Sequence, residues 1–173
     1  MKKKKKILLA FLLFILVCIA LGIVFFIFIA TTAGKFNPNK LYTKEASTLV
    51  DTDGNVYAKL GKQMRQKITY KQMSEELVNA IVATEDSRFF EHNGFDFPRF
   101  MKASFGQLLG RNAGGASTLT MQVSKNQYTS TVSSGLDGIK RKFTDIYISM
   151  FQIEPNYSKE EILEFYVNSY YLG

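Results

Sequence analysis

The sequence is poor in the residues that build metal centres and disulfide frameworks. Among its 173 residues there is one cysteine, Cys18, and one histidine, His92. A single cysteine excludes an intramolecular disulfide and a thiolate metal site. A single histidine excludes a histidine-rich metal centre. Cys18 stands inside an apolar segment, where the role of a small buried hydrophobe is expected.

A folded basic surface is also missing from the sequence. The chain has 22 Lys and Arg against 15 Asp and Glu, a formal net charge of +7, but five of the basic residues form the run Lys2–Lys6. The remaining 17 basic and 15 acidic residues carry a net charge of only +2. Because the excess charge lies in one tail and not on a folded face, nucleic acid is not an expected partner.

No charged residue occurs between Ile7 and Ala33. About 20 apolar residues suffice to cross a bilayer as a helix, so 7–33 is long enough with tilt to spare. The alternative is a cleaved signal peptide, whose apolar region usually runs only about 7–15 residues. The length favours an uncleaved signal anchor that spans a membrane once. The basic tail 1–6 then lies in the cytoplasm, and residues after about Lys35 lie outside.

The part after the apolar segment is predicted to be mainly helical. Residues 34–46 are typical of a linker, and 47–173 form one domain. Two short β-prone runs flank Asp53-Gly54, which indicates a hairpin. Ser74 can cap a helix that ends near Glu85-Asp86 and whose apolar face is expected at Leu77, Ala80, Ile81 and Thr84. Further helices are expected from the periodicity over Ser117–Gln127 and Ile139–Ile153, and from the capping box Ser158–Glu161.

Three polar clusters interrupt this apolar pattern, and each has a structural alternative. The first, residues 85–96, places carboxylates at a helix end beside aromatics, where desolvation can make a base. Its alternative is an ordinary charged helix terminus with Arg88 as partner. The second, residues 114–126, has hydroxyls, an amide and a lysine that could hold a sugar and a phosphate, or it is a capped surface helix. The third, Arg141–Asp145, could be a surface i,i+4 ion pair.

In their order and spacing the clusters resemble the glycosyltransferase family 51 domain, the peptidoglycan polymerase of class A penicillin-binding proteins and monofunctional transglycosylases. The first cluster matches the motif Glu-Asp-x-x-Phe-x-x-His-x-Gly-x-Asp through Glu85, Asp86, Phe89, His92, Gly94 and Asp96. The second matches Gly-Gly/Ala-Ser-Thr-x-Thr-x-Gln-x-x-Lys-Asn, and the third matches Arg-Lys-x-x-Glu. The resemblance covers roughly residues 45 to 173.

This resemblance implies a fold and a reaction. The fold is mainly α, a lysozyme-like transglycosylase lobe that is incomplete here, with a small β element near the membrane and one N-terminal transmembrane helix. The donor is the growing lipid-linked glycan chain and the acceptor is lipid II, joined by inverting transfer into a β-1,4 strand. Glu85 is implied as the general base and Asp145 as the second catalytic acid. The implied substrate-binding residues are Asp86, Phe89, His92, Lys102, Ser117, Thr118, Gln122, Lys125, Asn126, Arg141 and Lys142.

No metal ligand is expected, although a divalent cation (Mg or Mn) assists the pyrophosphate in some members of the family. Association with cell-division or elongation proteins is compatible with the resemblance. Lys102 stands where the family usually has arginine.

The match departs from the family at Met121, which replaces a glutamine, and in two further respects. Asp145 replaces a glutamate, and counting back from Ser158 indicates one extra residue in this helix, which a π-bulge could absorb. The chain stops at Gly173, where the family continues, so we expect a fragment, which a transpeptidase domain could follow. An alternative function is a catalytically inactive, membrane-anchored scaffold that binds glycan. Another is a lysozyme-type hydrolase, which the basic residues argue against.

Overall fold

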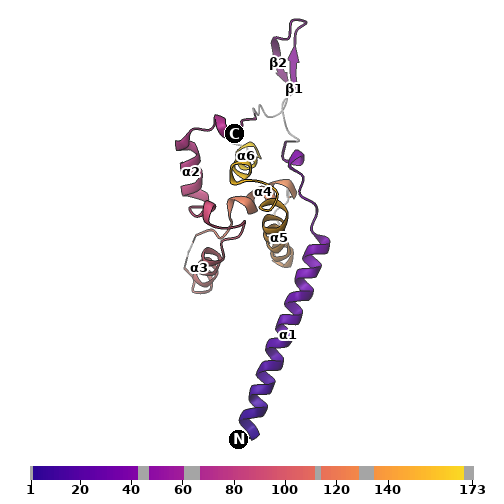
Figure 1. Ribbon diagram of the computed structural model, residues 1–173, viewed down its shortest axis with the longest axis vertical. Helices are drawn as coiled ribbons and strands as arrows, with labels where there is room; N and C mark the ends of the chain where they lie inside the picture. The colour runs from indigo at the N-terminus through magenta and orange to yellow at the C-terminus, as the bar shows by residue number, and fades with distance from the viewer. Residues whose placement is uncertain (1, 43–46, 61–66, 112–113, 129–134, 170–173) are drawn as a thin grey trace. The chain divides into compact units, whose positions relative to one another are not determined.

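The computed structural model describes residues 2–42, 47–60, 67–111, 114–128 and 135–169. They fall into two compact units, residues 1–34 and 35–173. The expected linker 34–46 contains the short 3-10 helix η1 (Pro38–Tyr42), and its residues 43–46 lie outside the described ranges. The mainly α class predicted from the sequence is confirmed, since the described strands make only one hairpin (Figure 1).

The first unit is the helix α1 (Lys2–Thr32). Its segment Lys4–Thr32 is long and apolar enough to cross a membrane, by length and composition. Nearly all of its large apolar side chains are exposed along its length. Such a surface is typical of a helix whose surroundings are lipid, because water would penalise the exposed area.

The second unit begins with the predicted hairpin. The strand β1 (Ser47–Val50) pairs antiparallel with β2 (Val56–Leu60), with a register shift between Leu49 and Val50. Gly54 has a φ of +84° in the turn between them. The Asp51 carboxylate accepts hydrogen bonds from the backbone N–H groups of Asp53 and Asn55 at 2.9 and 2.8 Å, and these fix the turn.

The next segment leads into the first acidic cluster. It contains η2 (Tyr70–Gln72), α2 (Glu75–Glu85), η3 (Phe89–Glu91) and α3 (Phe97–Leu108). Ser74 caps α2 as predicted, because its Oγ accepts the N–H of Leu77 at 3.2 Å. Asp96 caps α3 in the same way, through the N–H of Arg99 at 2.9 Å. The helix α2 ends at Glu85, as the sequence indicated.

The core of this unit forms around α4 (Leu119–Tyr128), which packs against η1, α5 (Gly135–Ile148), η4 (Ser149–Ile153) and α6 (Lys159–Ser169). The described parts of these elements contribute buried apolar side chains to one core. These side chains are Leu119, Met121, Val123, Ile148, Ile153, Ile162, Leu163, Phe165 and Tyr166. The capping box of α6 is confirmed by reciprocal hydrogen bonds between Ser158 and Glu161.

The helix α4 and the residue before it bury hydroxyl groups as well as apolar ones. Thr118 donates to the carbonyl of Gly94, Thr120 to the carboxylate of Glu154 and Ser124 to that of Asp145. All three hydroxyl-bearing residues are fully buried. Each is satisfied by a partner on another segment, so burial carries no desolvation penalty of an unpaired group. The alternative of a capped surface helix for this cluster is therefore wrong.

The element η4 is a π-helix that continues α5 directly. The sequence comparison with the family motifs predicted one extra residue in this stretch, and a π-helical turn is a structure that accommodates such a residue. Ser149 begins η4 and its Oγ donates to the carbonyl of Asp145 at 2.7 Å. The extra backbone width therefore follows immediately after the segment that carries Arg141, Lys142 and Asp145.

Candidate functional site

A cavity of about 370 Å³ opens between the end of α2, the start of α3, α4 and α5. Four elements that are distant in the sequence contribute to it. Seven of the residues singled out from the sequence lie on its wall: Glu85, Ser117, Gln122, Lys125, Arg141, Lys142 and Asp145. The remaining lining residues are Thr84, Arg99, Gly115 and Met121. The fold thus brings parts of all three polar clusters to one place.

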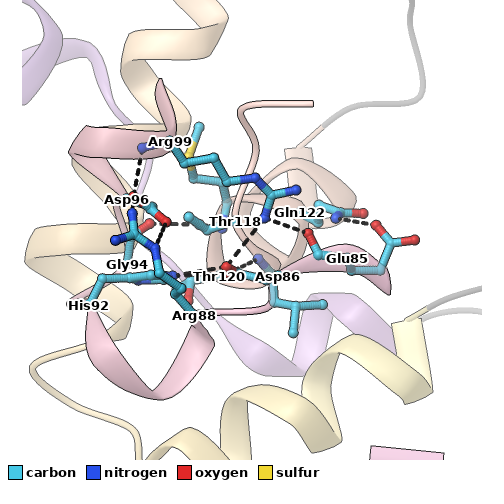
Figure 2. A network of polar contacts seen from close by, with 12 residues as sticks. Glu85, Asp86, Arg88, His92, Gly94, Asp96, Arg99, Thr118, Thr120 and Gln122 are labelled. Carbon is cyan, nitrogen blue, oxygen red and sulfur yellow. Dashed lines mark hydrogen bonds and ion pairs between the residues drawn. The ribbon is translucent and has the colours of Figure 1, made fainter. Parts of the chain in front are cut away.

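Glu85 presents a carboxylate at the C-terminal end of α2. Its Oε2 accepts a hydrogen bond from Nε2 of Gln122 on α4, at 2.9 Å (Figure 2). The side chain is only partly buried and keeps further lone pairs open to the cavity. A carboxylate held in this way can accept a proton from a hydroxyl group placed in the cavity. The alternative of an Arg88 partner is wrong, since Arg88 pairs with Asp96.

The cavity wall is rich in positive charge. Lys125 comes from α4, Arg141 and Lys142 come from α5, and Arg99 comes from α3. Nζ of Lys142 donates to Oγ of Ser117 at 2.7 Å, and burial lowers the pKa of this lysine, while the nearby Asp145 raises it. Nε of Arg141 is buried and meets no acceptor within the part of the chain that the structure describes. Four cations facing two carboxylates favour an anionic ligand.

Asp145 is a buried carboxylate on the same wall, with only 6% of its surface exposed. It accepts a hydrogen bond from Oγ of Ser124 at 3.3 Å. Burial raises its pKa from 3.8 to about 6, and the Ser124 hydroxyl and the neighbouring cations oppose this rise. A surface ion pair with Arg141, the alternative considered for this cluster, does not describe a carboxylate so deeply buried.

Asp86 has a different place from its neighbour Glu85. It is fully buried and does not line the cavity. Its Oδ2 accepts the N–H of Leu119 at 3.0 Å, at the first residue of α4, and Nε2 of His92 lies at the same distance. A carboxylate at a helix N-terminus is stabilised by the free N–H groups and the helix dipole. Asp86 therefore links the α2 end to the α4 start, which are the two segments that carry Glu85 and Gln122.

Five further predicted residues also stand away from the cavity wall. Phe89 is completely buried beneath Nζ of Lys159, which lies 4.5 Å from the ring centroid. His92 is engaged with Asp86, and Thr118 with Gly94. Asn126 donates to Ser169 at 3.0 Å, and Lys102 is exposed on α3. In this geometry most of these residues support the framework around the cavity.

Asp86, His92 and Asp96 place their oxygen and nitrogen atoms within 4.8 Å of one another, as a metal site would require. Their atoms are already occupied. Asp96 binds the guanidinium of Arg88 and the N–H of Arg99, and Asp86 binds Leu119 and His92. A guanidinium already balances the charge of Asp96, and that of Arg99 lies 3.5 Å from Asp86, so a divalent cation does not fit this cluster.

Two groups of residues at or near the site were not singled out from the sequence. Arg99 lies on the cavity wall, three residues after the helix cap Asp96. Glu154 and Lys159 form an ion pair at 2.8 Å, and Lys159 also donates to the carbonyl of His92 at 2.6 Å. Glu154 in turn accepts from Thr120 of α4. The only sequence signal for these groups was charge next to a recognised motif, which does not distinguish them from surface residues.

Comparison with known proteins adds an independent observation. A family model described as Transglycosylase matches residues 53–173. Penicillin-binding protein 1A of Vibrio cholerae is 36% identical over 94% of this chain and 20% of that protein. Penicillin-binding protein 1A/1B of Bacillus subtilis is 35% identical over 98% of this chain and 18% of that protein. The corresponding Escherichia coli protein is 37% identical over 72% of this chain. The chain spans about a fifth of the length of the first two relatives.

Proposed function

The chain belongs to the transglycosylase family, and from this premise we propose that its exterior domain is a peptidoglycan glycosyltransferase that polymerises lipid II. The observation that carries the proposal is the cavity in which the carboxylate of Glu85 faces a wall with four cations. One carboxylate and several cations are the groups that glycosyl transfer from a pyrophosphate donor requires. A hydrolase of the lysozyme type has no phosphate to bind, so it does not account for these cations.

In the proposed reaction Glu85 is the general base. It takes the proton from the sugar 4-hydroxyl of the acceptor while that oxygen attacks the anomeric carbon of the donor. The bond from this carbon to the pyrophosphate oxygen breaks, and the electron pair leaves with the lipid pyrophosphate. A single displacement inverts the α-linked donor and produces a β-1,4 bond. Gln122 orients the carboxylate through its hydrogen bond to Oε2.

The departing pyrophosphate gains negative charge during this step. Lys125, Arg141 and Lys142 lie on the same wall and are proposed to stabilise that charge. Preorganised cations act strongly in a cavity from which water is partly excluded. Asp145 is proposed as the second acid, which keeps Lys142 and Arg141 in place through charge.

The lipid parts of both substrates agree with a membrane location. We propose that α1 anchors the protein in the bacterial cytoplasmic membrane with its N-terminus inside, so that the catalytic domain meets the substrates outside. The lysine run before the apolar segment supports this orientation. Partners in cell division or elongation remain a prediction from the family resemblance.

The proposal is tested by polymerisation of labelled lipid II with the intact protein in detergent. We expect the wild type to elongate glycan and Glu85→Gln to be slower by about 10²–10⁴-fold, the range for loss of a general base. Glu91→Gln is the matched control, since Glu91 is exposed in the same motif and lies outside the cavity wall.

Two results would contradict the proposal in different ways. Polymerisation by Glu85→Gln at the wild-type rate would remove Glu85 as the base. Shortening of preformed glycan, without elongation of lipid II, would replace the transferase with a hydrolase.

A further inference from the structure

The guanidinium of Arg99 occupies a position in the cavity that no sequence motif assigned to it. The residue lies on α3, and its side chain lines the cavity together with Glu85 and Gln122 (Figure 2). It reaches the cavity from a helix that contributes no other residue to this wall. The question is what such a group does beside the proposed base.

The backbone of Arg99 is held in place by the N-cap of α3. Its N–H donates to Oδ1 of Asp96 at 2.9 Å, and Asp96 is itself held by the guanidinium of Arg88. Asp96 is the N-cap of α3, so Arg99 sits in the first turn of that helix. A short, capped connection of this kind restricts the directions available to the side chain.

Three contacts then orient the guanidinium. Nε donates to the carbonyl of Gly115 at 2.9 Å, and Nη1 donates to the carbonyl of Glu85 at 2.9 Å. Nη1 also lies 3.5 Å from Oδ1 of Asp86. Arg99 thereby connects the glycine-bearing segment before α4 with the end of α2.

The contact with the Glu85 carbonyl stabilises the C-terminal end of α2. The last carbonyl groups of a helix have no partner inside the helix, and a cation near them is favourable. The last turn of α2 contains no basic residue of its own. Arg99 supplies the missing cation from α3 and holds the backbone of the residue that carries the proposed base.

These contacts leave part of the guanidinium unused. An arginine has five N–H donors, and the two on Nη2 of Arg99 meet no acceptor among the residues that the structure describes. The side chain is 28% exposed and borders the cavity. The two N–H groups of Nη2 can donate to phosphate oxygens, and the positive charge of the guanidinium strengthens such hydrogen bonds.

Lys102, the residue of α3 that the family resemblance indicated, has a different place. It follows Arg99 by three residues on the same helix, is exposed, and is absent from the cavity wall. We propose that Arg99 is the α3 cation that binds a phosphate of the donor pyrophosphate, and that the same guanidinium positions Glu85. The inference rests on the proposed transferase function for the identity of that phosphate.

The test is calorimetric binding of inorganic pyrophosphate to the intact protein in detergent, with the wild type, Arg99→Gln, Arg99→Lys and Lys102→Gln. Loss of a charged hydrogen-bond donor predicts an affinity lower by roughly tenfold to a hundredfold in Arg99→Gln. Arg99→Lys keeps the charge but not the planar guanidinium that is held by Gly115 and Glu85, and it is expected between that variant and the wild type. Lys102→Gln should bind within about twofold of the wild type, since it removes an exposed charge.

Positioning of Glu85 is read separately from binding. With labelled lipid II, Arg99→Gln is expected to lower kcat as well as to raise KM, and Arg99→Lys should restore part of both. A thermal midpoint for each variant shows whether it is folded. Should Arg99→Gln fail to fold, the folded Arg99→Lys still has to bind pyrophosphate more weakly than the wild type.

Equal pyrophosphate affinity in all four proteins would overturn the inference, as would a wild type that does not bind pyrophosphate. A weakening in Lys102→Gln as large as that in Arg99→Gln would also overturn it. A wild type that binds pyrophosphate through Arg99 but does not elongate lipid II would support this inference and contradict the proposed function. The two proposals therefore fail in distinguishable ways.

Discussion

The adjacent acids Glu85 and Asp86 show how differently neighbouring residues can serve one site. Glu85 lies on the cavity wall with its carboxylate bound to Gln122. Asp86 turns into the interior, where it binds the first N–H of α4 and the ring of His92. The helix ends between them, so their side chains take separate directions. One acid faces the proposed substrate, and the other joins the segments that hold the first acid in place.

The burial of Asp145 predicts that the free energy of unfolding depends on pH. The folded protein holds the Asp145 proton up to about pH 6, whereas an unfolded chain releases it near the ordinary value of 3.8. The folded state therefore binds more protons between these values, and the free energy of unfolding falls as the pH rises through this window. The difference between the two pKa values corresponds to a loss of about 3 kcal/mol in the free energy of unfolding across this window.

Asp145→Asn removes this titration while keeping a group that can bond to Ser124. We expect the variant to be more stable than the wild type above pH 6 and to lose the dependence on pH between about 4 and 6. Urea unfolding at several pH values measures both effects. Parallel pH profiles for the two proteins would show that Asp145 has an ordinary pKa.

At the scale of elements, the π-helix η4 packs against the loop of the first acidic cluster at an unusually short distance. Gly94 in that loop has a φ of +81°. A Cβ atom at this position would lie 2.9 Å from the backbone carbonyl of Ser149 and from Cγ of Glu154. The glycine therefore serves two purposes, a left-handed backbone and a close approach of two elements.

Gly94→Ala should accordingly destabilise the protein by more than about 2 kcal/mol, since backbone strain and steric overlap add. Gly110→Ala is the matched control. Gly110 follows the end of α3 with a φ of +69°, but none of the described residues lies within 4 Å of a Cβ there, so only about 1 kcal/mol of strain is expected. Thermal unfolding of both variants separates the two causes. Equal losses of stability in the two variants would mean that η4 can shift away from residue 94 with no loss of stability.

For the whole molecule, the helix α1 and the domain that follows it belong to separate compact units. The first exposes apolar side chains along its length. The second buries an apolar core around α4, although it also exposes large apolar side chains such as Leu108 and Leu136. The surface of the first unit therefore suits lipid, whereas the second unit has an apolar core of its own. A membrane-anchored enzyme with a lipid-linked substrate would have this division.

Cysteine labelling tests the proposed orientation, because the chain has only Cys18 to remove. In a Cys18→Ser background, Thr52→Cys in the hairpin turn should react with a membrane-impermeant maleimide on intact cells. Lys4→Cys should react only after the membrane is permeabilised, since positively charged flanks stay in the cytoplasm. Labelling of Lys4→Cys in intact cells would contradict the proposed orientation and place the N-terminus outside.

Much of the local structure was determined by the sequence itself. The caps Ser74 and Ser158–Glu161, the hairpin turn at Gly54 and the long apolar segment all act over a few neighbouring residues, so their patterns are readable along the chain. Periodicity predicted α2 but not its buried face, since Val78 is buried while Leu77 is exposed. Which face is buried depends on what packs there.

The site itself was decided by tertiary structure. Its wall joins residues from four elements, up to 61 positions apart between Thr84 and Asp145. Motif spacing identified seven of the residues on this wall. It could not separate wall residues such as Gln122 from framework residues such as Thr118. Arg99 and Lys102 carry the same charge three residues apart on one helix, and hydrogen bonds to the carbonyls of Glu85 and Gly115 hold the Arg99 side chain at the cavity. Side-chain direction depends on such long-range contacts, and these have no signature in the local sequence.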